Sequence, residues 1–265
     1  MNTLAGHLFW IWLASAVFML LMWLIQLRTK NAAIVDIAWT FLVGAGGLAA
    51  CYFASGDIAR RQLTAVLIAL WALRLDAHLI ARFWGEPEEG RYQAMRKAWG
   101  PATNLRMLAF YQYQALSVPL FVWSVALAAA NPAPLFQVTD GLALVIWLVG
   151  VSGVSLADWQ LTRFKATAAQ RGLKGTTCRD GLWRYSRHPN YFFEWVHWWT
   201  FLLLAWGGPW FWLAAGTPLV LLYFLLFVTG IPPTEAQGIV SRGDDYRDYQ
   251  RTTSPFVPWF PRSSA

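Results

Sequence analysis

Long apolar runs, separated by short polar stretches, set the pattern of the chain. Seven of these runs approach the length of about 20 residues that an α-helix needs to cross the hydrocarbon core of a bilayer. The pattern therefore predicts an all-α membrane protein with a bundle of seven transmembrane helices. The predicted spans are about 7–27, 32–54, 63–80, 108–130, 142–161, 191–206 and 210–230, followed by a tail at 231–265.

The composition supports this class of protein. Hydrophobic residues make up 57% of the 265 residues and charged residues only 13%, whereas soluble domains carry about a quarter charged residues. No repeat or separate soluble stretch stands out, so we expect one membrane domain over residues 1–265. Gly44, Gly46 and Gly47 lie inside the second span with no strand before them, and so predict close helix packing rather than a dinucleotide-binding loop.

Basic residues fall in alternate connections between the spans. The connections after spans one, three and five and the tail carry almost all of them, whereas the opposite set holds only Arg60 and Arg61. By the positive-inside rule, the N-terminus is outside and the C-terminus is cytoplasmic. The net charge of +7 then lies mostly on the cytoplasmic face, where it attracts either lipid headgroups or an anionic ligand. We expect a bacterial inner membrane protein with membrane lipid around it, and neither nucleic acid nor an obligate protein partner.

Charged side chains inside the spans are candidates for function, because a charge at the bilayer centre costs at least about 2.5 kcal/mol. Asp36 lies near the start of the second span, where it can be hydrated, pair with Lys30 or belong to a site. In the third span, steps of three and four residues predict one polar stripe, formed by Trp71, Arg74, His78 and Arg82.

Two further spans carry polar residues near their ends. Tyr111 and Tyr113 lie at the start of the fourth span, where they either line a cavity or belong to the interfacial aromatic belt. Asp158 and Lys165 are seven residues apart and share one face at the end of the fifth span. Both arrangements are compatible with a ligand at the cytoplasmic membrane surface.

The segment GLWRYSRHPNYFFEWVHWW, residues 181–199, joins a basic turn to an aromatic helix. A helix that begins at Pro189 places Asn190, Glu194 and His197 on one face. A helix N-terminus attracts anions, so we expect a phosphate-bearing ligand here rather than only a basic turn followed by a buried Glu–His pair. The turn supplies cations and hydrogen-bond donors from Arg184, Tyr185, Arg187 and His188.

The sequence of the tail predicts an ordered segment rather than a free, flexible end. The sequence Gly230-Ile231-Pro232-Pro233 predicts a break after the seventh span, and Glu235 follows it. Tyr246 and Tyr249 lie among the basic residues of the tail and precede an aromatic and proline-rich end. We expect the tail to fold back under the bundle.

Two stretches, GLWRYSRHPNYFFEW at 181–195 and GDDYRDYQRTTSPFVPWFP at 243–261, resemble the steroid 5-alpha-reductase family and its bacterial relatives. The resemblance covers about the last four-fifths of the chain. It implies a seven-helix oxidoreductase that binds NADPH from the cytoplasmic side and reduces the 4,5 double bond of a 3-oxo-4-ene steroid or a similar lipophilic enone from the bilayer. Isoprenylcysteine carboxyl methyltransferases have a similar turn and tail, so methyl transfer from S-adenosylmethionine is the alternative. A transporter or lipid-binding protein is the third reading.

The resemblance also implies a set of cofactor-binding residues. At matching positions these are Arg74, Asp158, Lys165, Tyr185, Asn190 and Glu194. Charge and position add His78, Arg82, Arg187, His188 and Tyr191, with Glu235 and Tyr246 closing over the cofactor from the tail. The family has arginine and asparagine where this chain has Lys165 and Val154.

The catalytic residues follow from the same resemblance. The family pairs a glutamate of the second helix with a tyrosine of the third to polarise the substrate carbonyl. Here the nearest acid is Asp36 and the tyrosine position holds Trp71, whose N–H lacks the acidity of a phenol. We therefore expect Asp36, alone or with Tyr111 or Tyr113, to stabilise the enolate oxygen while hydride adds to C5. We expect no metal, because the two cysteines lack metal-ligand spacing.

Overall fold

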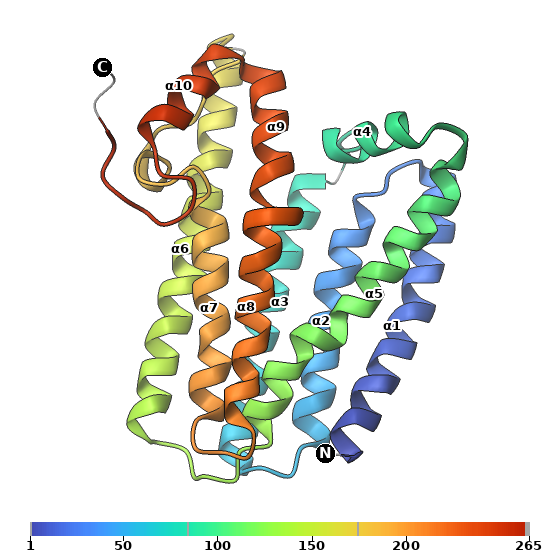
Figure 1. Cartoon of the computed structure of the whole chain (residues 1–265), viewed down its shortest axis with the longest axis vertical. Coiled ribbons are helices and arrows are strands. Elements are labelled where there is room, and N and C mark those ends of the chain that lie inside the picture. The colour runs from blue at the N-terminus through green and yellow to red at the C-terminus, as the bar shows by residue number, and fades with distance from the viewer. Residues whose placement is uncertain (1, 84, 174, 263–265) are drawn as a thin grey trace. The chain divides into compact units, whose positions relative to one another are not determined.

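The structure, a computed structural model, describes residues 2–83, 85–173 and 175–262. Helices dominate these residues, and no strand occurs among them (Figure 1). In this part of the chain, six helical segments are long and apolar enough to cross a membrane: Leu4–Thr29, Ile34–Phe53, Ile58–Phe83, Gly90–Ala129, Val138–Gln170 and Phe211–Arg242. The predicted all-helical membrane class is therefore confirmed.

The chain divides into two compact units. The first unit consists of Met1–Asp140 and Phe201–Thr217, and the second unit of Gly141–Thr200 and Pro218–Ala265. The expectation of one reductase domain over residues 1–265 stays a prediction.

The first unit is built around its second helix. The helix α2 packs against α1, α3 and α5. The elements of this unit are α1 (Asn2–Thr29), α2 (Ile34–Phe53), α3 (Ile58–Phe83), α4 (Gly90–Trp99), the 3-10 turn η1 (Gly100–Ala102), α5 (Thr103–Ala129) and the 3-10 turn η3 (Phe211–Ala215).

Three glycines allow these helices to approach α2 closely. A Cβ atom on Gly44 would lie 2.6 Å from the Cβ of Ala72 in α3, and one on Gly47 would lie 2.9 Å from Ile68. A Cβ atom on Gly46 would lie 3.0 Å from a methyl group of α5. Any larger residue would force these helices apart, so the predicted role of the glycines in helix packing is confirmed.

A buried arginine joins several segments of the first unit. The guanidinium group of Arg60, at the start of α3, donates to both carboxylate oxygens of Asp140, at 2.5 and 2.9 Å. It also donates to the carbonyl oxygens of Ala133, Pro134 and Leu204, at 3.0, 3.1 and 2.8 Å. Arg60 is fully buried, so it contributes to packing rather than to the charge of a hydrated loop.

The second unit contains longer helices than the sequence predicted. The helix α6 continues to Gln170 instead of 161, because residues 162–170 contain neither glycine nor proline and favour a helix. The elements are α6 (Val138–Gln170), the 3-10 turn η2 (Gly181–Arg184), α7 (Pro189–Ala205), α8 (Gly216–Tyr223), the π-helical turn η4 (Phe224–Val228), α9 (Ile231–Arg242) and α10 (Asp244–Thr252).

The helix is interrupted at Thr229 and Gly230, where the sequence predicted a break. The π-helical turn Phe224–Val228 precedes Gly230, and α9 begins immediately afterwards at Ile231. Prolines in the first turn of a helix lose no intrahelical hydrogen bond, so Pro232 and Pro233 start α9 instead of stopping the chain.

The helices α6 and α7 run antiparallel in the second unit (Figure 1). A Cβ atom on Gly150 would lie 2.5 Å from the Cβ of His197, and one on Gly153 would lie 2.3 Å from the ring of Phe193. The two glycines therefore let α7 lie close against α6, with His197 and Phe193 facing Gly150 and Gly153.

The tail is ordered, as the sequence predicted, and the structure shows that it returns to the turn at η2. The hydroxyl of Ser186 donates to the carbonyl of Phe256 at 2.7 Å, and the backbone N–H of Trp259 donates to the carbonyl of Tyr185 at 2.8 Å. The hydroxyl of buried Tyr249 in α10 donates to the carbonyl of Ser186 at 3.1 Å. The turn and the tail thus form one structure.

Candidate functional site

Asp36 forms a carboxylate–phenol pair in the first unit. It lies in the first turn of α2, and its Oδ2 accepts a hydrogen bond of 2.9 Å from the hydroxyl of Tyr92 in α4. The same oxygen forms an ion pair with Arg91, whose guanidinium lies 4.6 Å from the centre of the Tyr92 ring. Arg91, and not Lys30, is therefore the cation that pairs with Asp36.

The helix α4 is held over the start of α2 by a second carboxylate. Glu88 accepts a hydrogen bond of 2.7 Å from the backbone N–H of Ala32 and forms an ion pair of 2.8 Å with Arg96 of α4. These contacts fix α4 and place Tyr92 beside Asp36.

The two tyrosines expected to assist Asp36 have other positions. The buried hydroxyl of Tyr111 donates to the carbonyl of Ala32 at 3.1 Å, and the side chain of Tyr113 is exposed. Tyr92 takes the place beside the carboxylate, and the sequence reasoning missed it. The sequence contained a signal: Tyr92, Met95 and Trp99 recur at helical spacing in Gly90–Trp99. The structure leaves all three less than fully exposed.

The polar stripe of α3 runs from the core to the surface of the first unit. Trp71 is fully buried and packs edge-on against Trp39, with ring centres 6.4 Å apart, so it is a packing residue. Arg74 and His78 are half-buried. Arg82 is exposed and forms an ion pair with Glu89, which is the role of an interfacial arginine.

In the second unit, α6 and α7 bring predicted cofactor residues together. The side-chain amide of Asn190 donates to Oδ1 of Asp158, with 3.2 Å between the atoms. Glu194 lies one turn further along α7, and its Oε1 accepts a hydrogen bond of 3.3 Å from Trp198 and lies 3.7 Å from Nδ1 of His197. Two carboxylates and one carboxamide therefore follow one another along the contact between α6 and α7.

Three other predicted ligands form a network inside the protein. Oε1 of Glu235 accepts a hydrogen bond of 2.6 Å from Arg187 and lies 3.3 Å from Nε2 of His188. Arg187 also donates to the carbonyls of Gln250 and Thr253, both at 2.8 Å. Burial lowers the pKa of His188. These side chains connect the turn, α9 and α10, and their contacts with a cofactor stay a prediction.

The aromatic residues of this region mostly pack against the protein. Tyr191 stacks on His188 with ring centres 5.3 Å apart, and its hydroxyl is 3.1 Å from that of Thr234. Tyr246 is buried beneath the guanidinium of Arg242, and burial raises the pKa of Tyr246 to about 12. Tyr246 therefore stabilises the tail as a neutral phenol.

The two remaining predicted ligands lie at the surface of the second unit. Lys165 is exposed on α6, and Tyr185 is partly exposed after η2, with its ring against Phe260. Both are accessible to a ligand. Among the described residues, no group of three His, Cys, Asp or Glu side chains could hold a metal ion.

A family profile matches residues 22–253, and the family is described as "Protein of unknown function (DUF1295)". The chain belongs to this family. No curated protein and no solved structure matches the chain. The residues of the Asp36 pair, the Asp158–Asn190 contact and the Glu235 network all lie within the matched range.

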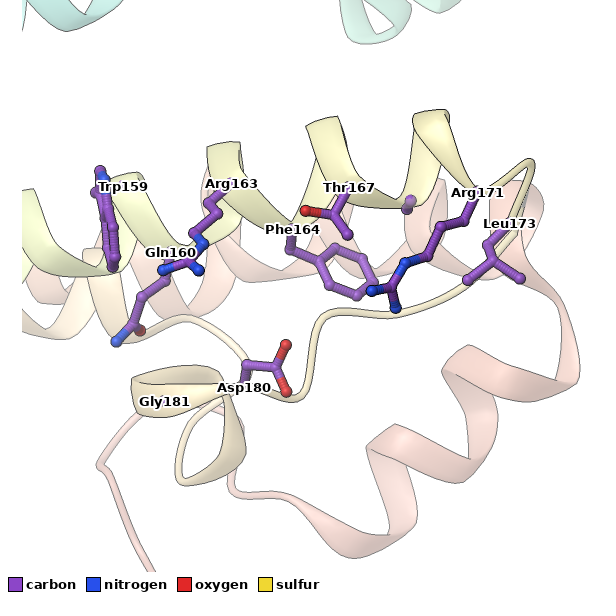
Figure 2. Close-up of a pocket in the computed structure, with 10 residues that line it drawn as sticks. Trp159, Gln160, Arg163, Phe164, Thr167, Arg171, Leu173, Asp180 and Gly181 are labelled. Atoms are coloured by element: carbon purple, nitrogen blue, oxygen red, sulfur yellow. The ribbon is translucent and has the colours of Figure 1, made fainter.

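The second unit of this DUF1295 protein also contains a groove that the sequence did not reveal (Figure 2). Its volume is about 470 Å³, and it lies between the end of α6 and the segment leading to η2. Arg163, Arg171 and Asp180 contribute its charges. The sequence contained no signal of it, because the groove depends on how residues 175–181 return to α6.

Proposed function

We propose that this DUF1295 protein is an NADPH-dependent reductase of a lipophilic enone, such as a 3-oxo-4-ene steroid. The observation that carries the proposal is the hydrogen bond between Tyr92 and Asp36. The resemblance to steroid 5-alpha-reductases implies a carboxyl–phenol pair near the substrate carbonyl, and Trp71 left the phenol unassigned. Tyr92 supplies that phenol from a different helix.

The donor set of the second unit fits a nicotinamide nucleotide. Asp158 and Glu194 offer carboxylate acceptors for ribose hydroxyl or carboxamide N–H groups, and Asn190 both donates and accepts. The exposed ammonium of Lys165 suits a phosphate. When bound, NADPH supplies the hydride. The Glu235 network positions the start of α7, and thereby Asn190, instead of touching the cofactor.

Residues of the first unit have the complementary task in this proposal. Negative charge develops on the carbonyl oxygen as an enone is reduced, and a donor aimed at that oxygen lowers the barrier. We assign this role to the phenol of Tyr92 and the guanidinium of Arg91. Asp36 orients both groups, since its carboxylate contacts each of them. The single O–H of Tyr92 turns from Asp36 to the carbonyl oxygen when the enone is bound.

We also propose seven membrane crossings, with the N-terminus outside and the C-terminus in the cytoplasm of a bacterial cell. The seventh crossing is α7, whose 17 residues span about 25 Å, close to the hydrocarbon thickness of about 30 Å. Its antiparallel contacts with α6 support this assignment, because α6 is itself long enough to cross.

Methyl transfer from S-adenosylmethionine is the second candidate. One observation favours it: Arg187, the arginine expected to meet a phosphate, is engaged by Glu235 and by two carbonyl oxygens of the tail. S-adenosylmethionine carries no phosphate and needs no such arginine.

The test uses the full-length protein purified in detergent. It is incubated with NADPH and a 3-oxo-4-ene steroid, and NADPH oxidation and the mass of the product are followed. We expect oxidation with a product heavier by two hydrogens, and thermal stabilisation by NADP⁺. Stabilisation by S-adenosylmethionine alone, without NADPH oxidation, would refute the reductase proposal.

Two conservative variants separate the candidate phenols. Tyr92→Phe removes the proposed donor to the enolate oxygen, so we expect kcat to fall by about a hundredfold, the usual effect of losing one such donor. Tyr111→Phe removes a hydroxyl that donates to the backbone of Ala32, and kcat should change much less. The reverse order would make Tyr111 the catalytic phenol.

A further inference from the structure

The groove at the end of α6 lies on a part of the helix that extends beyond the bilayer core. The helix has 33 residues and is about 50 Å long, whereas the hydrocarbon core is about 30 Å thick. The groove's volume of about 470 Å³ lies within the range of small-ligand sites. Figure 2 shows Arg163, Phe164, Thr167 and Arg171 projecting from α6 toward the segment that carries Asp180.

The groove has an excess of one positive charge. Arg163 and Arg171 line it with one carboxylate, that of Asp180. Within the described parts of the chain, neither arginine forms an ion pair; Arg163 lies 5.3 Å from the ring of Trp159. By contrast, Arg179 of the neighbouring segment is paired with two aspartates of α10. Two guanidinium groups are therefore directed to the same hollow, and the one carboxylate of Asp180 leaves one of their charges uncompensated.

An apolar stripe leads along α6 to this hollow. Val145, Val149, Leu156 and Trp159 are exposed and follow one another at steps of about one or two helical turns, and the stripe ends at Arg163. Exposed tryptophan next to arginine is typical of the boundary between acyl chains and headgroups. A molecule with a long apolar chain and an anionic head matches the two parts of this surface.

We propose that the groove binds the headgroup of an anionic glycerophospholipid, with the phosphodiester between Arg163 and Arg171. A phosphodiester carries one negative charge, which equals the excess in the groove. The hydroxyl of Thr167 and the carboxylate of Asp180 are partners for headgroup hydroxyls. Gln160 accepts a hydrogen bond of 2.9 Å from the backbone of Leu182 and thereby holds the floor of the groove.

The lipid site is distinct from the proposed cofactor residues. Asp158 faces Asn190 of α7, and Arg163 lies five residues later, which is about 140° further around the helix. The proposal therefore does not depend on the reductase function, and it assigns the groove to lipid rather than to the nucleotide.

The test measures lipid binding to the full-length protein in a neutral detergent, by native mass spectrometry and by thermal stabilisation. Short-chain phosphatidylglycerol is compared with phosphatidylcholine of the same chain length and with glycerol phosphodiester lacking acyl chains. We expect phosphatidylglycerol to bind best. Arg163→Gln and Arg171→Gln should each weaken its binding by about tenfold, the usual effect of losing a charge-assisted hydrogen bond.

Arg247→Gln is the matched control, because it removes an exposed charge of the same unit that is already paired with Asp244. We expect it to bind phosphatidylglycerol like the unchanged protein, and circular dichroism checks the fold of all three variants. An equal loss in the control would overturn the proposal, because it would indicate general surface charge. Equal affinity for the phosphodiester without chains, or displacement of the lipid by NADP⁺, would also overturn it in favour of a soluble phosphate ligand.

Discussion

Arg60 in the first unit and Arg163 in the second are both arginines of long apolar helices, but their guanidinium groups have opposite surroundings. Arg60 is fully buried and donates to Asp140 and to three backbone carbonyls. Arg163 lines an open groove and contacts the ring of Trp159. Residue type and position in a span are thus poor guides to the function of an arginine. A better guide is the number of its guanidinium N–H groups that are hydrogen-bonded within the protein.

Arg187 lies between these two extremes. Its side chain is nearly buried, and Glu235 and two carbonyls of the tail engage it. By the criterion of donor use, Arg187 stabilises the fold as Arg60 does, and its contact with an anion stays a prediction. We therefore expect the loss of stability to be largest when Arg60 is removed, smaller when the contacts of Arg187 are removed, and smallest for Arg163 and Arg171.

The largest effect is expected for Arg60→Ala. This change leaves the buried carboxylate of Asp140 without its cation, and breaking such a buried pair costs about 3–5 kcal/mol. Denaturant unfolding of the purified protein in detergent measures the loss. Arg61→Ala is the neighbouring control: Arg61 donates to the carbonyl of Cys51 at 2.9 Å, so a smaller loss is expected. Equal losses of stability in the two variants would contradict the distinction between Arg60, whose guanidinium is fully hydrogen-bonded inside the protein, and Arg61.

A smaller effect is expected for Glu235→Gln. The change removes the charge that Arg187 and His188 contact, and a hydrogen bond to a charged group contributes about 1.5–3 kcal/mol. Limited proteolysis should show faster cleavage of the tail, because α10 and the turn are joined through this network. Asp244→Asn, at an exposed position, should leave the cleavage rate unchanged. An unchanged rate in both variants would contradict the structural role of Glu235.

The pH dependence of the free energy of unfolding gives a separate test of the network around Glu235. Burial lowers the pKa of His188 below its ordinary value of 6.5, so the unfolded chain takes up a proton at a higher pH than the folded protein does. Its contribution to stability is therefore complete above about pH 6.5 and declines as the pH falls, by at most about 1.4 kcal/mol per pH unit. Unfolding measured at several pH values between about 7.5 and 5.5 tests this. His188→Gln should flatten the slope, and an equally steep slope would assign it to other groups.

The smallest effect on stability is expected for Arg163→Gln and Arg171→Gln. In lipid-free detergent, each change should alter the free energy of unfolding by less than about 0.5 kcal/mol, as is usual for surface residues outside special contacts. A loss as large as that of Glu235→Gln would mean that the groove arginines stabilise the fold, and the comparison with Arg60 would fail.

The sequence predicted the helices of the membrane region well, because apolar runs of this length have few alternatives. It also predicted the packing role of Gly44 and Gly47, since only glycine admits helices so close. Helix ends were less predictable. No long apolar run marks the last turns of α6, so the sequence ended this helix too early. The π-helical turn before the break at Gly230 had no signal in the sequence.

For the candidate site, the sequence by itself determined the chemical types: Asp36 in an apolar helix, and Asp158, Asn190 and Glu194 at helical spacing. Periodicity along one helix is a local property, so it can be read from residue order. Only the tertiary structure decided the partners, namely Tyr92 for Asp36 and Glu235 for Arg187, because these residues are 56 and 48 positions apart. Hydrogen bonds over such distances depend on how helices and turns return to one another, and no local pattern specifies that.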